Sequence, residues 1–442
     1  MSRTRESTAT GSAALGEADR ELLLRLLALS TAGPLETGGR EPVELWEAQR
    51  AYAEAAAELG FRVVHHAPAG PEALTGDEVP LVVREAVRTV PGFLDCQPNM
   101  VLRLGPDTLP RAATVMFNVH LDTVAGGGAV SFDGRRFHGR GAIDAKGPAV
   151  ALLAGLRAAL ESVPGLGTGT GVLIQLVAGE EGGAMGVFGT RVLVGQGYLG
   201  RLNVFCEPTG CRVLPRATAA MTARLRVSGR DGIDDAPGAG HNATVLLGHL
   251  AQHLALALPP HAVDGQVCIA GLHTGELHNK VYGTGQLLLN LSYGSRASGQ
   301  AMERALTEAV RTGLAGFRSH FADQPLFAAT ARDADRLTTL EWLKRGLPAL
   351  GGRDTWAEEL LLDRAGLDPW PADQPAFTCD AIWLAQVPGT STVVFGPGDL
   401  GANQAHAEGE FAELAELDRY SAAVTRLLTA FAHHRPDQGT ER

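Results

Sequence analysis

Apolar residues recur with two different periods along this chain of 442 residues, which predicts a protein that mixes helices and strands. Helical spacing predicts helices at Ala18–Thr31, Glu44–Leu59, Pro148–Leu160 and Leu414–Phe431. Short runs rich in β-branched and aromatic residues predict buried strands at Phe61–His65, Asn99–Leu104, Thr114–Val119, Val172–Val177 and Ser391–Phe395. Strands that alternate with helices in this way indicate an α/β domain with a mixed, mostly parallel sheet flanked by helices.

The pattern changes near Arg216, where strands and helices follow in the order β-α-β-β-α. Strands are expected at Thr218–Ser228, Gln266–Gly271 and Gln286–Tyr293, and helices at Asn242–Leu256 and Gln300–Leu314. This order is typical of a compact α+β unit with an antiparallel sheet, inserted into the first domain. The predicted organisation is a disordered tail at 1–17, a catalytic domain at 18–214 and 332–442, and an inserted lid domain at 215–331. Helices are expected between about Leu337 and Leu367.

Composition narrows the class of protein. A formal charge of −11 and a pI near 5.7 argue against nucleic-acid binding as the main activity. No run approaches 18 consecutive apolar residues, so we expect no membrane span. The five cysteines are scattered and the first 20 residues do not resemble a signal peptide. We therefore expect free or buried thiols and a cytoplasmic protein.

Polar side chains gather where the predicted strands end. His120 and Asp122 follow one strand, two residues apart, which suits a metal-binding histidine oriented by a carboxylate. The other members of this set are Asp144 on a glycine-rich loop, Glu180 and Glu181 in AGEEGG, Glu207 in FCEPTG, and His406 beyond the last strand. Mixed histidine and carboxylate ligands suit a site for two zinc-like ions, which implies hydrolysis of an amide. Of the paired glutamates, one can bind metal while the other takes a proton from water.

The motifs VHLDTV, DGRRFHGRGAIDAKG, GEEGG, CEPTG and FGPG followed by H and E resemble one known family, over almost the whole chain from Ala18. It is the family of dinuclear metallohydrolases that includes aminoacylase, carboxypeptidase G, acetylornithine deacetylase and succinyl-diaminopimelate desuccinylase. The resemblance implies two divalent ions, with Zn²⁺ as the default and Co²⁺ or Mn²⁺ as alternatives. It also implies a lid domain that forms a homodimer and a cis peptide bond after the bridging aspartate.

The resemblance assigns a role to each residue of the set. His120 and Glu207 would bind one ion, Glu181 and His406 the other, and Asp144 would bridge them. Asp122 would orient His120, and Glu180 would be the general base.

The lid departs from the family pattern at two positions. Ile233 stands where the family has a histidine that stabilises the oxyanion, and Ser292 stands where it has an arginine that grips a substrate carboxylate. Asn279, a substrate-binding position, is present. His278 beside it is a candidate substitute donor, although a solvated loop histidine explains it as well.

Three interpretations follow from an intact metal set with an altered lid. The protein hydrolyses an amide in an N-acyl amino acid, a peptide or a related metabolite, or in an amino acid attached to a carrier protein. Alternatively, it uses the metal centre for amide formation, cyclisation or elimination in a biosynthetic pathway. In the third interpretation it is a metal-binding partner without catalysis, although a structural metal site would not need the unligated Glu180.

Overall fold

The computed structural model describes residues 13–434, which form two compact units. Unit 1 holds Val82–Ala217 together with the segments up to Thr75 and from Gly352 onward. Unit 2 holds Thr218–Gly351 and the short segment Gly76–Leu81. The insertion therefore runs some 20 residues beyond the predicted boundary at 331.

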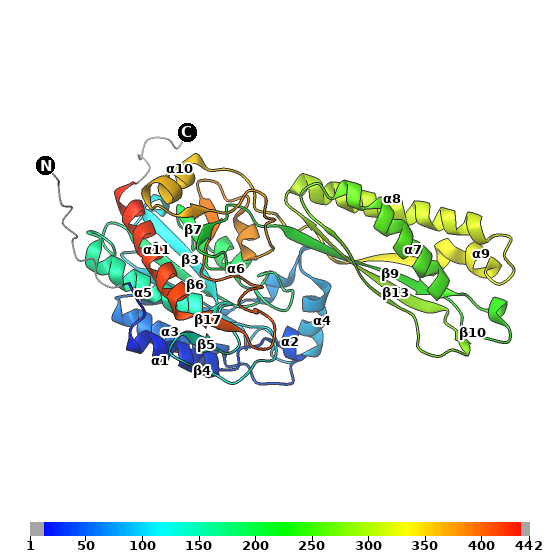
Figure 1. Ribbon diagram of the computed structural model, residues 1–442, viewed down its shortest axis with the longest axis horizontal. Helices are drawn as coiled ribbons and strands as arrows, with labels where there is room; N and C mark the ends of the chain where they lie inside the picture. Colours follow the sequence, from blue (N-terminus) through cyan, green and yellow to red (C-terminus); the bar gives the residue numbers. More distant parts are fainter. Residues whose placement is uncertain (1–12, 435–442) are drawn as a thin grey trace. The chain divides into compact units, whose positions relative to one another are not determined.

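Unit 1 is built on a six-stranded mixed sheet in the order β1-β2-β6-β3-β7-β16 (Figure 1). The strands span Arg62–Pro68 (β1), Pro98–Leu104 (β2), Thr114–His120 (β3), Gly171–Val177 (β6), Leu202–Phe205 (β7) and Ser391–Val394 (β16). The pairs β3/β6, β3/β7 and β7/β16 are parallel, whereas β1/β2 and β2/β6 are antiparallel. Strands β3 and β6 are buried along their whole length, which explains their continuous apolar sequences.

Helices α1 (Glu17–Ala28), α3 (Leu45–Glu58), α5 (Lys146–Ser162) and α11 (Leu414–His433) pack together beside this sheet (Figure 1). The hydroxyl of Tyr52 on α3 donates to the carbonyl of Ala149 on α5 at 2.9 Å. Helices α5 and α11 come very close at Gly155, where a Cβ atom would lie 2.6 Å from the Ser421 carbonyl oxygen. Glycine is required there because the two backbones leave no room for a side chain.

Shorter elements complete unit 1. Helices are α2 (Pro34–Thr37), α4 (Leu81–Thr89, which begins in unit 2), α6 (Thr190–Gly195) and α10 (Thr355–Glu358), with a π-helix at Glu359–Arg364 and 3-10 turns at Pro71–Leu74, Arg111–Ala113 and Asp380–Leu384. Strands β4 (Ser131–Phe132), β5 (Arg136–His138) and β17 (Phe411–Glu413) form a small sheet, and β8 (Arg212–Val213) pairs with β15 (Asp368–Pro369).

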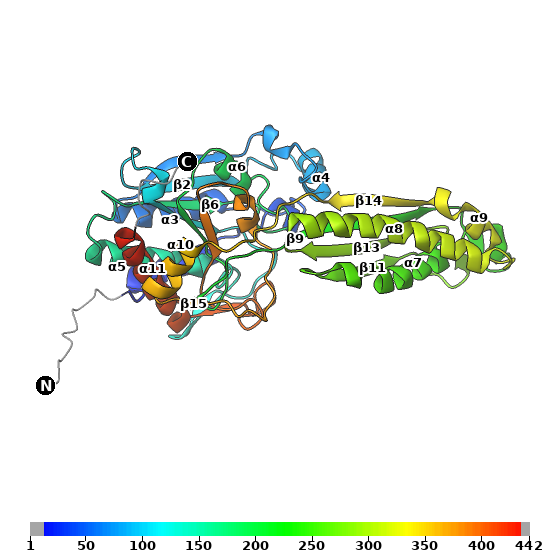
Figure 2. The same cartoon turned by 90° about the horizontal axis from the view of Figure 1, so that it is seen from above.

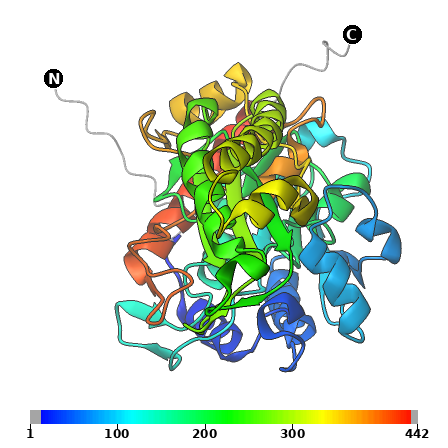
Figure 3. The same ribbon diagram turned by 90° about the vertical axis from the view of Figure 1, so that its right-hand side faces the viewer.

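Unit 2 is a four-stranded antiparallel sheet with helices on one face (Figure 2). The sheet order is β11 (Val267–His273), β13 (Thr284–Tyr293), β9 (Ala219–Ser228) and β14 (Thr338–Lys344). Helices α7 (Ala243–Ala257), α8 (Arg296–Phe321) and α9 (Ala328–Leu337) lie together against it, as the end-on view of Figure 3 shows. A two-stranded ribbon, β10 (Gly232–Ile233) with β12 (Lys280–Val281), and 3-10 turns at Pro237–Ala239 and Pro259–His261 complete the unit.

Two sequence-based expectations differ from the structure. Helices were expected from about Leu337, but Thr338–Lys344 is strand β14, because its β-branched and aromatic residues pair with the outer edge of β9. The tail predicted at 1–17 lies mostly outside the described residues. Its last part is ordered, because Leu15 is buried and its N–H donates to Asp418.

The cysteines agree with the sequence-based expectation, because all five are free thiols and Cys206, Cys211 and Cys379 are buried. Burial raises the pKa of the Cys206 thiol to about 12. Within residues 13–434, no helix is both long and apolar enough to cross a membrane.

The close approach of α5 and α11 predicts opposite effects for two glycine-to-alanine substitutions. Gly155→Ala should destabilise unit 1 by about 1–3 kcal/mol, because the added methyl meets backbone and Val424. Gly248→Ala on α7 is the matched control, because no atom lies within 4 Å of its Cβ position. It should add about 0.5–1 kcal/mol through helix propensity. Urea unfolding measures both; a neutral Gly155→Ala would contradict the close packing.

Candidate metal centre

The candidate site lies at the carboxyl ends of the four parallel strands of unit 1. His120 is the last residue of β3, Glu180 and Glu181 follow β6, Glu207 follows β7, and His406 lies on the loop beyond β16. Parallel strands end at the same edge of a sheet, so these side chains converge although 286 residues separate His120 from His406. Asp144 joins them from the loop before α5, and its peptide bond to Ala145 is cis, as expected.

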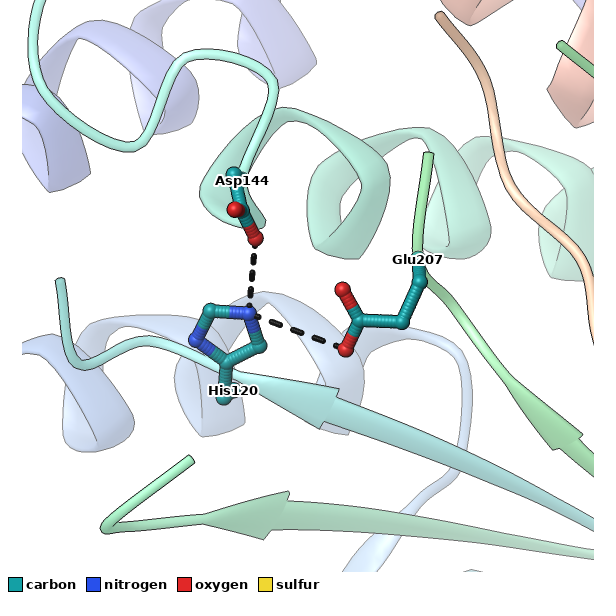
Figure 4. Close-up of side chains that lie close together, drawn as sticks. All are labelled: His120, Asp144 and Glu207. Carbon is teal, nitrogen blue, oxygen red and sulfur yellow. Dashed lines mark hydrogen bonds and ion pairs between the residues drawn. The ribbon is translucent and has the colours of Figure 1, made fainter. Parts of the chain in front are cut away.

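Asp144 lies between two histidines and offers one oxygen to each. His120 Nε2 lies 3.0 Å from Asp144 Oδ1, and His406 Nε2 lies 3.0 Å from Asp144 Oδ2. A second carboxylate accompanies each histidine, since Glu207 Oε1 is 3.8 Å from His120 Nε2 and Glu181 Oε1 is 2.9 Å from His406 Nε2. Figure 4 shows the first half of this arrangement, with the three side chains of His120, Asp144 and Glu207 pointing toward one point.

These donors fit two metal ions. The ligand atoms of His120, Asp144 and Glu207 lie within 4.8 Å of one another, as do those of Asp144, Glu181 and His406. Ligands that bind one zinc ion tetrahedrally at about 2.0–2.1 Å are about 3.3 Å apart, close to the observed separations. The two clusters share only Asp144, whose two oxygens point to different histidines, which is the arrangement that a bridging carboxylate requires.

Burial and mutual repulsion set the charge of these groups. Burial raises the pKa of Glu207 to about 8 and the pKa of Glu181 above its ordinary value. Burial would also raise the pKa of Asp144, but the hydrogen bonds with His120 and His406 outweigh it and lower that pKa. Hydrogen bonds to Asp144 and Glu181 raise the pKa of His406 to about 10. The buried glutamates therefore hold protons until a cation takes the place of those protons.

Glu180 lies next to this pocket without joining either histidine–aspartate contact. Its carboxylate comes within 4.8 Å of the ligand atoms of His120 and Glu181, and among residues 13–434 no hydrogen bond to its side chain is found. Burial, and then the charge of Glu207, raises the pKa of Glu180 well above the ordinary glutamate value. A carboxyl group with a raised pKa and no structural hydrogen bond is suited to accept and release a proton.

Asp122 holds the glutamate loop as well as the neighbourhood of His120. Its Oδ2 accepts the N–H groups of Gly179 (3.1 Å) and Glu181 (3.2 Å). His120 Nδ1 lies 2.9 Å from the Asp122 backbone carbonyl oxygen, and the carboxylate Oδ1 is further away at 3.8 Å. The backbone of Asp122 therefore fixes the imidazole, and its side chain holds the main chain at Gly179 and Glu181, on either side of Glu180.

Glu410 is a supporting residue to which the sequence assigned no role. It is 3% exposed, and its Oε1 accepts the N–H groups of Ile143 (3.1 Å) and Asp144 (3.3 Å). Its Oε2 accepts a 2.7 Å bond from Arg140. Glu410 thus holds the main chain that carries Asp144. The only sequence signal was its place four residues after His406.

A chain of buried polar side chains runs behind the site. Asn118 on β3 donates to Gln175 (2.8 Å) and Thr190 (3.1 Å), and the Thr190 hydroxyl donates to Asp380 Oδ2 at 2.6 Å. Asp380 is fully buried, and its Oδ1 has no hydrogen-bond partner within the described part of the chain. Burial raises the pKa of Asp380 to about 7. A carboxyl group in this setting holds a proton near neutral pH.

The predicted lid residues belong to unit 2. His278 and Asn279 are exposed on the loop between β11 and β12. Ile233 pairs with Lys280 beside them and is 59% exposed. Ser292 is half-buried on β13, where its Oγ accepts the N–H of Gln266 at 2.9 Å. Substrate binding by His278 and Asn279 remains a prediction.

Comparison with known proteins agrees with the geometry. Residues 116–430 match the profile of "Peptidase family M20/M25/M40", which is more than half of the chain. A curated relative from Aeropyrum pernix, named putative [LysW]-lysine/[LysW]-ornithine hydrolase, is 33% identical over 224 residues. That alignment covers 50% of this chain and 59% of the relative, so the chain spans about three-fifths of the length of the relative.

Solved structures of similar fold include peptidases. A tripeptidase from Staphylococcus aureus matches with a TM-score of 0.67 and 16% identity, covering 95% of this chain and 100% of that one. An M20 family metallo-carboxypeptidase from Sulfolobus solfataricus matches with a TM-score of 0.66 and 11% identity, again over 95% and 100%. At such identities these two structures are similar to this chain in fold only.

The contacts of Glu410 predict a large loss of stability when its carboxylate is removed. Glu410→Ala leaves the guanidinium of Arg140 and two backbone N–H groups without their acceptor, which should cost about 3–5 kcal/mol. Glu410→Gln keeps an acceptor for the backbone and should cost less. Glu408→Ala, an exposed position in the same loop, is the control. Denaturant unfolding measures all three, and equal stabilities for Glu410→Ala and Glu408→Ala would contradict the support role.

The burial of Asp380 predicts a pH dependence of stability. Because its pKa in the folded protein is above the unfolded value, its contribution is complete below about pH 4 and is lost as the pH rises through 7. The metal-free protein should lose stability relative to Asp380→Asn over this interval, at a slope of at most about 1.4 kcal/mol per pH unit. Urea unfolding in EDTA at pH 5 to 8 measures it, with exposed Asp373→Asn as control. A difference that does not change with pH would refute the raised pKa.

Proposed function

The chain belongs to peptidase family M20/M25/M40. On that premise we propose that it is a metal-dependent hydrolase that cleaves an amide bond in a small N-acyl amino acid, a short peptide or a related metabolite. The observation that carries this proposal is the position of Asp144, with one carboxylate oxygen toward His120 and the other toward His406. Glu207 would complete the first metal site and Glu181 the second, with Zn²⁺ as the preferred ion and Co²⁺ or Mn²⁺ as alternatives.

The residues of this chain divide the work of hydrolysis. Two divalent ions bound there would supply an electrophile for the amide carbonyl and lower the pKa of a water molecule. Glu180 would remove a proton from the attacking water and deliver it to the leaving nitrogen. Its carboxylate is free for this role because another residue holds the loop: the carboxylate of Asp122 accepts the N–H groups of Gly179 and Glu181.

The substrate class follows from the relative and from the altered lid. The relative from Aeropyrum pernix is named for lysine and ornithine conjugates, so we include amides of basic amino acids, free or attached to a carrier protein, among the substrates. Ser292 cannot grip a carboxylate in the way an arginine does, and its Oγ already accepts the Gln266 N–H. We therefore expect a substrate that lacks the usual free α-carboxylate. His278 beside Asn279 would supply the donor that Ile233 lacks.

Unit 2 is proposed to act as a lid and to join two copies of the chain. Among residues 13–434, strand β11 is an edge strand that pairs on one side only, with β13, and could accept a strand from a second copy. The dimensions of β13 also favour two copies. Ser292 lies eight residues along this strand from Thr284, about 27 Å, while Asn279 lies beyond the Thr284 end. One small substrate cannot contact both positions of the same chain.

Free thiols suit our proposal of a cytoplasmic protein.

Hydrolysis can be tested together with metal content. The purified protein should bind about two ions per chain and cleave members of a panel of N-acyl amino acids and dipeptides, offered with free and amidated carboxyl ends. Glu180→Gln should lower kcat by about a hundredfold to ten-thousandfold, because proton transfer contributes that much, and should keep both ions. Glu161→Gln, an exposed glutamate on α5, is the control and should match the wild type.

Two outcomes would change the proposal. Full activity in Glu180→Gln would show that another group is the base. Two bound ions without cleavage of any amide would favour the non-hydrolytic alternative, in which the same centre serves amide formation, cyclisation or elimination. A preference for amidated substrates would support the role given to Ser292, and a preference for free carboxylates would contradict it.

A further inference from the structure

Unit 1 contains a polar cavity, lined in part by arginines, that the metal centre does not use. It has a volume of about 190 Å³ and lies between α11, strand β8 and the segment Gly366–Asp368. Its polar lining consists of Arg212, Arg419, Arg426, Cys211 and Asp368. Three guanidinium groups and one carboxylate therefore border a small space.

Two of the three arginines are held by neighbours. Arg426 Nε donates to the carbonyl of Ala365 at 3.1 Å, which leaves its terminal nitrogens available. The guanidinium of Arg419 lies against the Cys211 thiol, within hydrogen-bonding reach. Arg419, Ala423 and Arg426 follow one another at helical spacing on α11, so they share one face of the helix. Ala423 between them is small and leaves the cavity open.

The lining of this cavity carries more positive than negative charge, because it holds three arginines and one carboxylate, that of Asp368. Within residues 13–434, no ion pair joins any of the three arginines to a carboxylate, although most ion pairs of the chain involve an arginine. Glu416, one turn before Arg419, is engaged by the amide of Asn403 at 3.1 Å. In a chain with a net charge of −11, these three exposed arginines around one cavity form a local excess of positive charge that favours an anion.

We propose that this cavity, the arginine pocket, binds a small oxyanion of the phosphate type. Guanidinium groups match the oxygens of phosphate in pairs, through two parallel N–H···O bonds. The cavity is small enough to favour a single phosphate group over an acidic peptide. This proposal is independent of the amide hydrolysis proposed above, since no residue of the pocket belongs to the metal set.

The pocket is joined to the metal centre through the backbone. Two of its lining residues, Gly210 and Cys211, follow Glu207 by three and four residues. Both have left-handed backbone conformations (φ 64° and 59°). Their N–H groups donate to Gly398 (2.6 Å) and Gly396 (2.8 Å), on the segment that leads to His406. A phosphate bound to Arg419 and Arg426 would therefore steady the segment that carries Glu207.

The experiment is phosphate binding by metal-stripped protein, which removes any binding to metal ions. Isothermal titration calorimetry with inorganic phosphate at constant ionic strength should show one site per chain, absent with chloride. The double variant Arg419→Gln, Arg426→Gln should bind at least tenfold more weakly. Arg304→Gln, an exposed arginine on α8, is the matched control and should bind as the wild type does. Glycerol phosphate, tested in parallel, distinguishes the free ion from a phosphorylated metabolite by which of the two binds more tightly.

A second measurement uses the wild-type protein alone. Bound phosphate should slow alkylation of Cys211 by iodoacetamide, read by mass spectrometry, because the thiol lies against Arg419. Alkylation of Cys268, which is exposed on β11, should not change. Equal phosphate affinity in the wild type and the double variant, or a Cys211 alkylation rate that phosphate leaves unchanged, would overturn the proposal.

Discussion

The carboxylate of Asp144 is the constraint on which the site depends. It is buried between two histidines and lies 3.0 Å from each, so its two oxygens must be aimed in different directions at once. Burying such a charge is costly unless it is paired and its position is held. The surrounding structure meets this requirement from three sides: β3 delivers His120, the loop beyond β16 delivers His406, and Glu410 binds the main chain behind Asp144.

The burial of the carboxylates around Asp144 also explains how a bound cation would stabilise their ionised form. Glu180, Glu181 and Glu207 all have raised pKa values, because desolvation and their mutual repulsion oppose ionisation. A metal ion reverses this balance, since binding requires the carboxylates to lose their protons. Metal affinity, folding stability and pH are therefore coupled in this domain. The buried carboxyl group of Asp380 takes part in this coupling, because it interacts electrostatically with Asp122, His120 and Glu181.

The convergence of His120, Glu181 and Glu207 was predictable from the sequence because each lies at or just after the end of a strand, and parallel strands bring their ends together. Asp144 and His406 lie on longer loops, and the family resemblance assigned their metal-binding roles. The roles of Asp122 and Glu410 were not predictable, because both act through backbone N–H groups that no sequence pattern specifies. Strand β14 was missed for a different reason. It is an edge strand after a long helical stretch, and only its pairing with β9 distinguishes it from a helix.

The two departures from the family pattern, Ile233 and Ser292, lie where a substitution has little effect on the stability of the fold. His120, Asp144, Glu181 and Glu207 are buried and lie against one another or against His406, so a change there would leave charges unpaired. Ile233 lies on an exposed element at one end of unit 2, and Ser292 is half-buried toward the other end of β13. Exposed loops and strand ends can change residue without loss of packing. Substrate-binding residues can therefore change in unit 2 while the candidate metal ligands of unit 1 stay the same, which is the physical reason why we propose a new substrate and not a lost reaction.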